Sequence, residues 1–216
     1  MRWPLVLIAS LAAVWPAAQP AAAEDLFPDK NLEAVVRQYV FEKRMKNDPL
    51  VEADVVNIST IVGKGKKVAN LQGLDKCKSL ALLDLENNEI SDLTPIKDLK
   101  LIQSLTLAKN KIKDIGPLAG LTGIQYLEIS NNEVADLASL ANVKALTNLY
   151  ASHNQIKDLA PLANLPKLIS LYLDGNPLEN FQPLATLPSS NGSTSAARGS
   201  ATCRHWRGIR SGRTCS

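Results

Sequence analysis

Three residues of this sequence, Ser152, His153 and Asp158, are of the types that build a nucleophile, a general base and an orienting acid. Such groups must converge in space to act together. Ser152 and His153 are adjacent, so in a strand their side chains point in opposite directions, and Asp158 belongs to the turn that follows. We therefore predict that these residues form no catalytic triad and that the protein is not an enzyme.

Phosphate and metal chemistry have little support either. The segment GKGKK at residues 63–67 has no following Ser or Thr and no strand–helix setting, unlike a phosphate-binding loop. Cys77 lies among apolar positions, whereas Cys203 and Cys215 lie near the C-terminus. Their spacing predicts neither a zinc site nor a disulfide framework. We expect no metal and no cofactor.

The elements that position these residues come from an internal repeat of 22 residues, with five regular copies from Leu80 onward and one degenerate copy before them. Each copy follows the pattern L-x-x-L-x-L-x-x-N-x-I-x-D-L-x-P-L-x-x-L, which is that of a leucine-rich repeat. The pattern predicts a leucine-rich repeat solenoid of the α/β class, shaped as a right-handed horseshoe arc. Its concave side should be a parallel β-sheet and its convex side 3₁₀ or short helical turns.

Two polar residues recur at fixed positions of the 22-residue repeat, and we call each set of equivalent residues a column. One asparagine per repeat stands where the strand ends, and we expect it to bond backbone groups that the bend leaves without partners. One acid per repeat precedes the convex turn, where it can accept backbone N–H bonds. The asparagines are Asn88, Asn110, Asn132, Asn154 and Asn176, and the acids are Asp92, Asp114, Asp136 and Asp158, with Asn180 in the fifth place.

Residues 1–23 have the basic start, apolar stretch and small residues of a signal peptide, cleaved after Ala23. We therefore expect a secreted or periplasmic protein with no membrane span after cleavage. Residues 24–56 are predicted to form a helical N-terminal cap, begun by Asp29 or Asn31. Its buried face is predicted to hold Leu32, Val35, Val36, Tyr39 and Val40. The repeats then occupy residues 57–187.

Residues 188–216 form a basic tail without apolar periodicity, and we expect it to be disordered. Serines at 190, 193, 195 and 200 stand where a sixth repeat needs apolar residues. When a TCN serine codon is read in a frame that starts one base earlier, the codon becomes NTC, which always encodes Phe, Leu, Ile or Val. We therefore hypothesise that the tail is a frameshifted sixth repeat.

Charge argues against nucleic acid as a partner. Removing Arg2 and the five arginines of the tail from the 24 Lys+Arg leaves 18, against 21 Asp+Glu, all of them in residues 24–188. The part of the chain that contains the repeats is therefore mildly acidic, whereas nucleic-acid binding requires a basic face.

The outward positions of the predicted strands build the concave face, and three of the four tyrosines of the chain stand there. Tyr150 and Tyr172 are one repeat apart, so they should be neighbours at about 5 Å. Tyr126 lies on the preceding strand, one outward position earlier. Rigid aromatic side chains among small residues are typical of protein-binding hot spots. The predicted ligand-binding residues are Tyr126, Tyr150, Tyr172, Asp84, Glu86, Glu128, Asn148 and Asp174. The acids favour a basic partner surface.

Residues 26–188 resemble the internalin-type bacterial leucine-rich repeat proteins. The resemblance rests on the segments LFPDKNLEAVV, LQGLDKCKSL and NKIKDIGPLAGL. It implies a secreted or surface-attached binding module that engages a protein with its concave sheet. The sequence departs from the family in its few repeats and in lacking a C-terminal capping domain and a wall-anchoring signal, so the fold carries over but the ligand does not.

We predict a monomeric, non-catalytic module that binds a protein ligand. One alternative is the recognition region of a longer enzyme or surface-anchored protein. Another is a carbohydrate-binding module, because tyrosines also stack on sugars.

Overall fold

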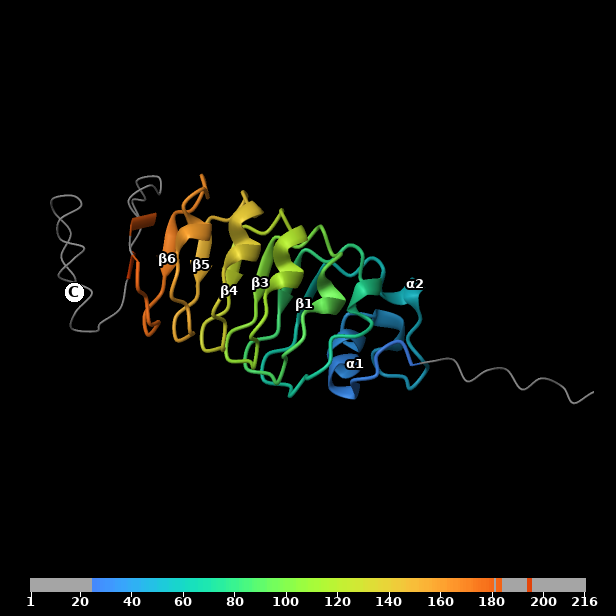
Figure 1. Ribbon diagram of the computed structural model, residues 1–216. Coiled ribbons are helices and arrows are strands. Elements are labelled where there is room, and N and C mark those ends of the chain that lie inside the picture. The colour runs from blue at the N-terminus through green and yellow to red at the C-terminus, as the bar shows by residue number, and fades with distance from the viewer. Residues whose placement is uncertain (1–24, 181, 184–193, 196–216) are drawn as a thin grey trace, which may run out of the picture.

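The computed structural model of the chain describes residues 25–180, 182–183 and 194–195. Within these residues seven strands form one parallel sheet in sequence order (Figure 1). The strands are β1 (Thr60–Val62), β2 (Leu82–Asp84), β3 (Ser104–Thr106), β4 (Tyr126–Glu128), β5 (Asn148–Tyr150), β6 (Ser170–Tyr172) and β7 (Thr194–Ser195). They follow one another along a single axis with the cap helices at one end, so the predicted solenoid is confirmed.

The strand register reproduces the sequence period. Leu83 of β2 lies opposite Leu105 of β3, and the pairs from β1 to β6 are all offset by 22 residues. The middle residue of each strand from β2 to β6 is buried, whereas its two neighbours are half-buried. Because side chains alternate along a strand, each of these strands sends its middle leucine into the core and presents two residues on the concave face.

The convex side consists of single 3₁₀ turns, as expected. They are η2 (Leu74–Lys76), η3 (Thr94–Ile96), η4 (Gly116–Gly120), η5 (Ala138–Asn142) and η6 (Ala160–Leu162). The acid column stands just before them: Asp114 Oδ1 accepts the N–H of Gly116 at 2.7 Å, and Asp158 Oδ1 accepts that of Ala160 at 2.9 Å. These bonds satisfy N–H groups that have no partner inside so short a turn.

The asparagine column joins neighbouring repeats through their backbones. The side-chain N–H₂ of Asn132 donates to the carbonyls of Leu107, Ile129 and Ser130 at 2.9, 2.9 and 3.4 Å. Its Oδ1 accepts the N–H of Ile112 at 3.0 Å. The equivalent asparagines make equivalent bonds, so the predicted structural role is confirmed.

A third column was not anticipated from the sequence. The residue just before each asparagine has a positive φ, in the left-handed region that favours glycine. Its members are Asn87, Lys109, Asn131, His153 and Gly175, with Gly65 at the equivalent position of the degenerate repeat, each 22 residues from the next. Glycine at two positions, asparagine at two others and histidine at one suit this conformation, because asparagine and histidine are enriched there among residues with a side chain. Lysine is not, and a strained backbone costs about 1–3 kcal/mol per residue.

The N-terminal cap consists of α1 (Lys30–Arg37), the 3₁₀ turn η1 (Phe41–Lys43) and α2 (Glu52–Val55). Leu32, Val35 and Val36 of α1 are buried against the first repeat. Asp29 begins α1, as predicted, and its Oδ1 accepts the N–H groups of Asn31 and Leu32 at 2.9 and 3.1 Å. Asp29 Oδ2 meanwhile accepts the N–H groups of Ala69 and Asn70 at 2.7 and 3.0 Å, so one carboxylate ties the cap to the repeats.

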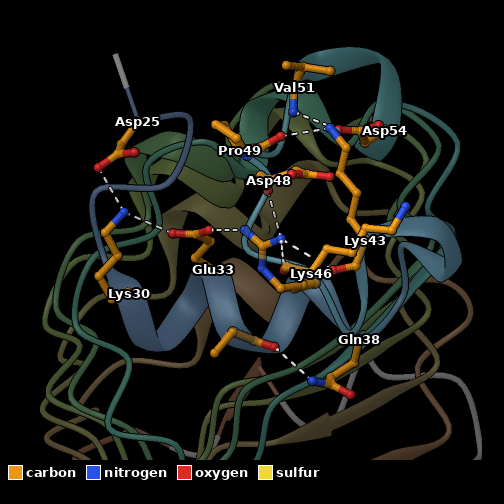
Figure 2. A network of polar contacts seen from close by, with 12 residues as sticks. Asp25, Lys30, Glu33, Gln38, Lys43, Lys46, Asp48, Pro49, Val51 and Asp54 are labelled. Atoms are coloured by element: carbon orange, nitrogen blue, oxygen red, sulfur yellow. Dashed lines mark hydrogen bonds and ion pairs between the residues drawn. The ribbon is translucent and has the colours of Figure 1, made fainter. Parts of the chain in front are cut away.

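Arg37, at the end of α1, holds the loop between the two cap helices. Its guanidinium donates to the carbonyls of Lys46 and Asp48 at 3.0 and 2.9 Å and forms an ion pair with Glu33. Figure 2 shows this network beside a second one, in which the ammonium of Lys43 contacts Asp54 at 2.7 Å. A planar guanidinium with several donors suits a set of converging carbonyls. The loop is therefore held by these polar contacts together with the buried side chains of Val40 and Leu50.

Tyr39 departs from the prediction that it lies on the buried helical face. The helix α1 ends at Arg37, so Tyr39 stands beyond it, and 37% of its surface is exposed. Its hydroxyl accepts the N–H of Val62 at 2.8 Å. A phenol needs a hydrogen-bond partner when it packs on a protein, and the free edge of β1 supplies one. Tyr39 therefore covers the first edge of the sheet.

We predict that Asp29→Ala lowers the free energy of unfolding by about 2–3 kcal/mol at neutral pH, because a helix cap and hydrogen bonds to a charged group are lost together. Burial raises the pKa of Asp29, but backbone N–H bonds from Ala69, Asn70, Leu32 and Asn31 outweigh it and lower the pKa below its ordinary value. The stability that Asp29 contributes is therefore fully present above the pKa that its carboxyl has in the unfolded chain, about 3.9. It is lost as the pH falls through the lower pKa that the carboxyl has in the folded protein.

Chemical denaturation at pH 7 and near pH 3 measures both effects. The difference between wild type and Asp29→Ala should shrink at the lower pH. Asp98→Ala, at an exposed convex position, serves as the control and should change stability by less than about 0.5 kcal/mol. An equal loss in the two variants would contradict the predicted role of Asp29.

The predictions for the two ends of the chain concern residues that lie mostly outside the described part. The signal peptide at 1–23 lies outside them, as does the tail apart from Thr194 and Ser195. These two residues form β7, in which Thr194 lies opposite Leu171 of β6, an offset of 23 residues where the preceding pairs have 22. The domain boundaries and the frameshift hypothesis stay predictions.

Candidate functional site

All eight predicted ligand-binding residues lie on the concave side of the sheet and are half-buried. Six of them stand within strands β2, β4, β5 and β6, and Glu86 and Asp174 follow β2 and β6 by two residues. The site therefore rests on regular, closely paired strands rather than on loops. Such a surface keeps its shape when a partner binds, which reduces the entropy lost on association.

The three tyrosines form one continuous aromatic cluster. The rings of Tyr150 and Tyr172 are stacked, with centroids 4.6 Å apart and planes 7° from parallel. Tyr126 lies opposite Asn148 in the register, one outward position from Tyr150, yet its ring centroid is 5.4 Å from that of Tyr150, at an interplanar angle of 39°. Both arrangements are favourable geometries for aromatic pairs. We call these three residues the tyrosine cluster.

The acidic residues divide into two groups. Glu86 forms ion pairs with Lys64 and Lys109, the latter at 2.9 Å, and hydrogen bonds from these two lysines lower its pKa. Within the described residues neither Asp84 nor Glu128 forms an ion pair. The negative charge of the concave face is thus largely compensated at Glu86 and persists at Asp84 and Glu128.

Glu128 stands beside the tyrosine cluster. It lies on the same strand and the same face as Tyr126, and directly opposite Tyr150 in the register. Its Oε1 accepts the N–H of Ser130 at 3.0 Å. Burial is the largest cause that raises the pKa of Glu128, and the charge of Glu86 adds to it. Burial likewise raises the pKa of Tyr126, followed by the charge of Glu128, so both side chains share a partly desolvated region.

Asn148 and Asp174 complete the predicted set. Asn148 Oδ1 accepts the hydroxyl of Thr147 at 2.7 Å, which orients the amide next to Tyr126 across the sheet. The carbonyl of Asp174 accepts the N–H of His153 at 2.6 Å, so the Asp174 backbone is held at the strand exit. These two residues border the tyrosine cluster on either side along the strands.

Sequence reasoning missed the lysines that flank Glu86. Lys64 occupies the position equivalent to Glu86 in the degenerate repeat, and Lys109 occupies the left-handed position that follows β3. The spacing is a signal that would have found Lys64, because Lys64 is 22 residues from Glu86 and is therefore its neighbour in the adjoining repeat. The degenerate pattern of that repeat obscured the relation.

The residues considered for catalysis lie at the exit of β5 and in the turn that follows it. Within the described part of the chain Ser152, His153 and Asp158 make no hydrogen bond with one another. Burial, followed by the charge of Asp75, raises the pKa of the Cys77 thiol to about 12, so this thiol stays protonated at neutral pH. Among residues 25–180 and the few described beyond them, no cluster of three His, Cys, Asp or Glu side chains suits a metal ion.

Comparison with known proteins gives one family model and many solved structures. The model described as leucine-rich repeats in two copies matches residues 100–142 and 144–186. An internalin of Listeria monocytogenes, InlF, is 29% identical, with a TM-score of 0.71 over 80% of this chain and 51% of that chain. A leucine-rich repeat protein of Leptospira interrogans is 26% identical, with a TM-score of 0.53 over 56% of this chain and 34% of that chain.

A second internalin of Listeria monocytogenes, InlC2, is 32% identical over 75% of this chain and 92% of that chain, with a TM-score of 0.44. The search of curated proteins finds no match. In the described residues no helix has the length and apolar character of a membrane span. The chain spans about half the length of InlF. The repeat match, the parallel sheet and the likeness to InlF together place this chain in the family of internalin-type bacterial leucine-rich repeat proteins.

Proposed function

We propose that this protein is a secreted or periplasmic, non-catalytic module that binds a protein ligand on its concave face. The observation that carries the proposal is the tyrosine cluster, whose three rings lie in contact on the solvent side of the sheet. The cluster is not needed to close the core, because the leucines of the same strands are already buried. Aromatic clusters that face solvent in this way are typical of interaction surfaces.

A rigid tyrosine cluster suits protein recognition for physical reasons. Each ring offers a large apolar surface and a hydroxyl, and stacking restricts its rotation before any partner arrives. Little side-chain entropy is therefore lost on binding. The likeness to InlF supports a binding role for the leucine-rich repeat region, and the identity of the ligand is a separate question. We further propose that the module is monomeric.

We predict that the triple variant Tyr126→Ala, Tyr150→Ala, Tyr172→Ala loses at least about a hundredfold in affinity for a protein ligand, since each hot-spot aromatic contributes about 1–2 kcal/mol. The wild-type protein would be screened against an array of extracellular protein domains and, in parallel, against a glycan array. Binding to the captured protein would then be measured by surface plasmon resonance. The variant should stay folded, with about 1 kcal/mol lost for each ring contact removed.

The matched control removes three exposed side chains from the convex turns, Lys97→Ala, Asn142→Ala and Asn164→Ala, and should leave the affinity unchanged. Equal binding by the tyrosine variant would place the site on the convex side or the loops and would overturn the proposal. Selective hits on the glycan array would favour the carbohydrate-binding alternative.

A second candidate follows from the length comparison. The chain spans about half of InlF, which supports the alternative that it is the recognition region of a longer enzyme or surface-anchored protein. Resequencing the gene from the codon for Phe181 onward tests this alternative together with the frameshift hypothesis. A missing or extra base would extend the repeats beyond the present tail. A confirmed reading frame would overturn the frameshift hypothesis.

A further inference from the structure

The concave face combines aromatic rings with a carboxylate at one place. Glu128 is directly opposite Tyr150 in the register and shares its strand and face with Tyr126. Strands in a sheet are about 4.8 Å apart, so the carboxylate and both rings fall within the span of one side chain of a partner. Aromatic faces attract cations, and a carboxylate binds them directly.

Within the described residues the carboxylate of Glu128 also lacks an internal counter-ion. Glu86 is paired with Lys64 and Lys109, whereas no lysine or arginine among the described residues is within ion-pair distance of Glu128. Glu128 is nevertheless half-buried, and its Oε1 accepts the N–H of Ser130. A partly desolvated carboxylate gains more from an added cation than one that is fully solvated.

We propose that this site takes an arginine side chain of the protein partner, with its guanidinium against the rings of Tyr126 and Tyr150 and paired with the carboxylate of Glu128. The inference rests on the proposed protein-binding function of the concave face. Arginine fits better than lysine because its planar guanidinium stacks on aromatic rings and bonds a carboxylate through two parallel N–H groups. The site thereby selects a basic segment of the partner.

The surroundings of Glu128 predict how binding depends on pH. The groups that face it are Tyr126 on its own strand, Tyr150 on β5, Glu86 after β2 and Lys109 after β3. Burial raises the pKa of Glu128, and the charge of Glu86 adds to this effect. Hydrogen bonds from Ser130 and the charge of Lys109 lower it, but the net shift is upward. Only the ionised carboxylate pairs with a guanidinium. Binding of the arginine should therefore weaken as the pH falls through the raised pKa of Glu128. This loss begins at a higher pH than for an ordinary glutamate, whose pKa is about 4.3.

The test uses small probes and the full chain. N-acetyl-arginine methylamide would be titrated into the protein while the ring resonances of the tyrosines are followed by NMR, with the lysine and citrulline analogues as comparisons. We expect saturable shifts at Tyr126 and Tyr150 with millimolar arginine probe. The lysine probe should bind several-fold more weakly, and the uncharged citrulline probe should cause no shift.

Glu128→Gln should weaken the arginine probe at least tenfold and abolish its pH dependence, while the dispersed tyrosine resonances report that the cluster is intact. Glu42→Gln makes the same chemical change at an exposed cap residue and should have no effect. Equal shifts with citrulline, or unchanged binding by Glu128→Gln, would overturn the inference. If the arginine probe fails while array hits still depend on the tyrosines, the arginine site is refuted and the proposed function stands.

Discussion

Replacing Asn132 by alanine is expected to lower the free energy of unfolding by about 4 kcal/mol. The change removes four backbone contacts at once, because the side chain donates to the carbonyls of Leu107, Ile129 and Ser130 and accepts the N–H of Ile112. Only 8% of Asn132 is exposed, so water cannot easily replace these bonds. Each buried backbone group that loses its partner costs about 1–3 kcal/mol, and local relaxation recovers part of the sum.

Urea denaturation of the full chain measures this loss, and hydrogen exchange at the amide of Ile112 locates it. Asn142→Ala deletes the same amide at an exposed position of η5 and should cost less than about 0.5 kcal/mol. A loss below about 1 kcal/mol in Asn132→Ala would mean that the column does not hold the repeats together.

Gly73→Ala is the second large effect, at about 3–5 kcal/mol. Gly73 has a φ of 94°, which a side chain disfavours, and a Cβ placed there would lie 2.2 Å from the carbonyl oxygen of Leu26. It would also lie 2.7 Å from the ring of Phe27, which is buried. The chain that leads into the cap therefore has to move away from the first repeat, and the apolar face of α1 loses part of its cover.

Gly65→Ala is the comparison that separates the effect of a strained backbone from the effect of steric overlap at Gly73. Gly65 also has a positive φ, of 67°, but the nearest atom to an added Cβ is the side-chain nitrogen of Asn87 at 3.5 Å, an ordinary contact. We expect about 1 kcal/mol for Gly65→Ala. Chemical denaturation of both variants, with hydrogen exchange across α1, makes the comparison. Similar small losses would show that the passage of Leu26 and Phe27 over Gly73 contributes little.

The repeat architecture was predictable because its causes lie in short-range sequence. The spacing of Leu83 and Leu85 places both inside, and the same spacing recurs every 22 residues, so one repeat predicts the next. The asparagines and the acids before the convex turns were predictable for the same reason, since each bonds backbone groups of its own or the adjoining repeat. The sequence named Asp29 and Asn31 as candidate caps of α1, and the structure shows that the cap is Asp29.

Other features depended on side chains meeting across repeats or between the cap and the solenoid. The sequence predicted that Tyr150 and Tyr172 are neighbours, but the contact of Tyr126 with Tyr150 follows from ring orientations that no spacing specifies. The exposure of Tyr39 was decided by where α1 ends and by the edge of β1 that its hydroxyl reaches. The two lysines that form ion pairs with Glu86 likewise come from different repeats.

By itself, then, the sequence determined the solenoid, its period, its inward and outward faces and the residues of the candidate site, because all of these follow from periodicity along the chain. Only the tertiary structure decided which acids are compensated, which backbone positions are left-handed, and that Gly73 lies under the segment leading into the cap. The physical reason is that charge pairing, ring contact and close backbone approach depend on distances between residues that the sequence keeps far apart.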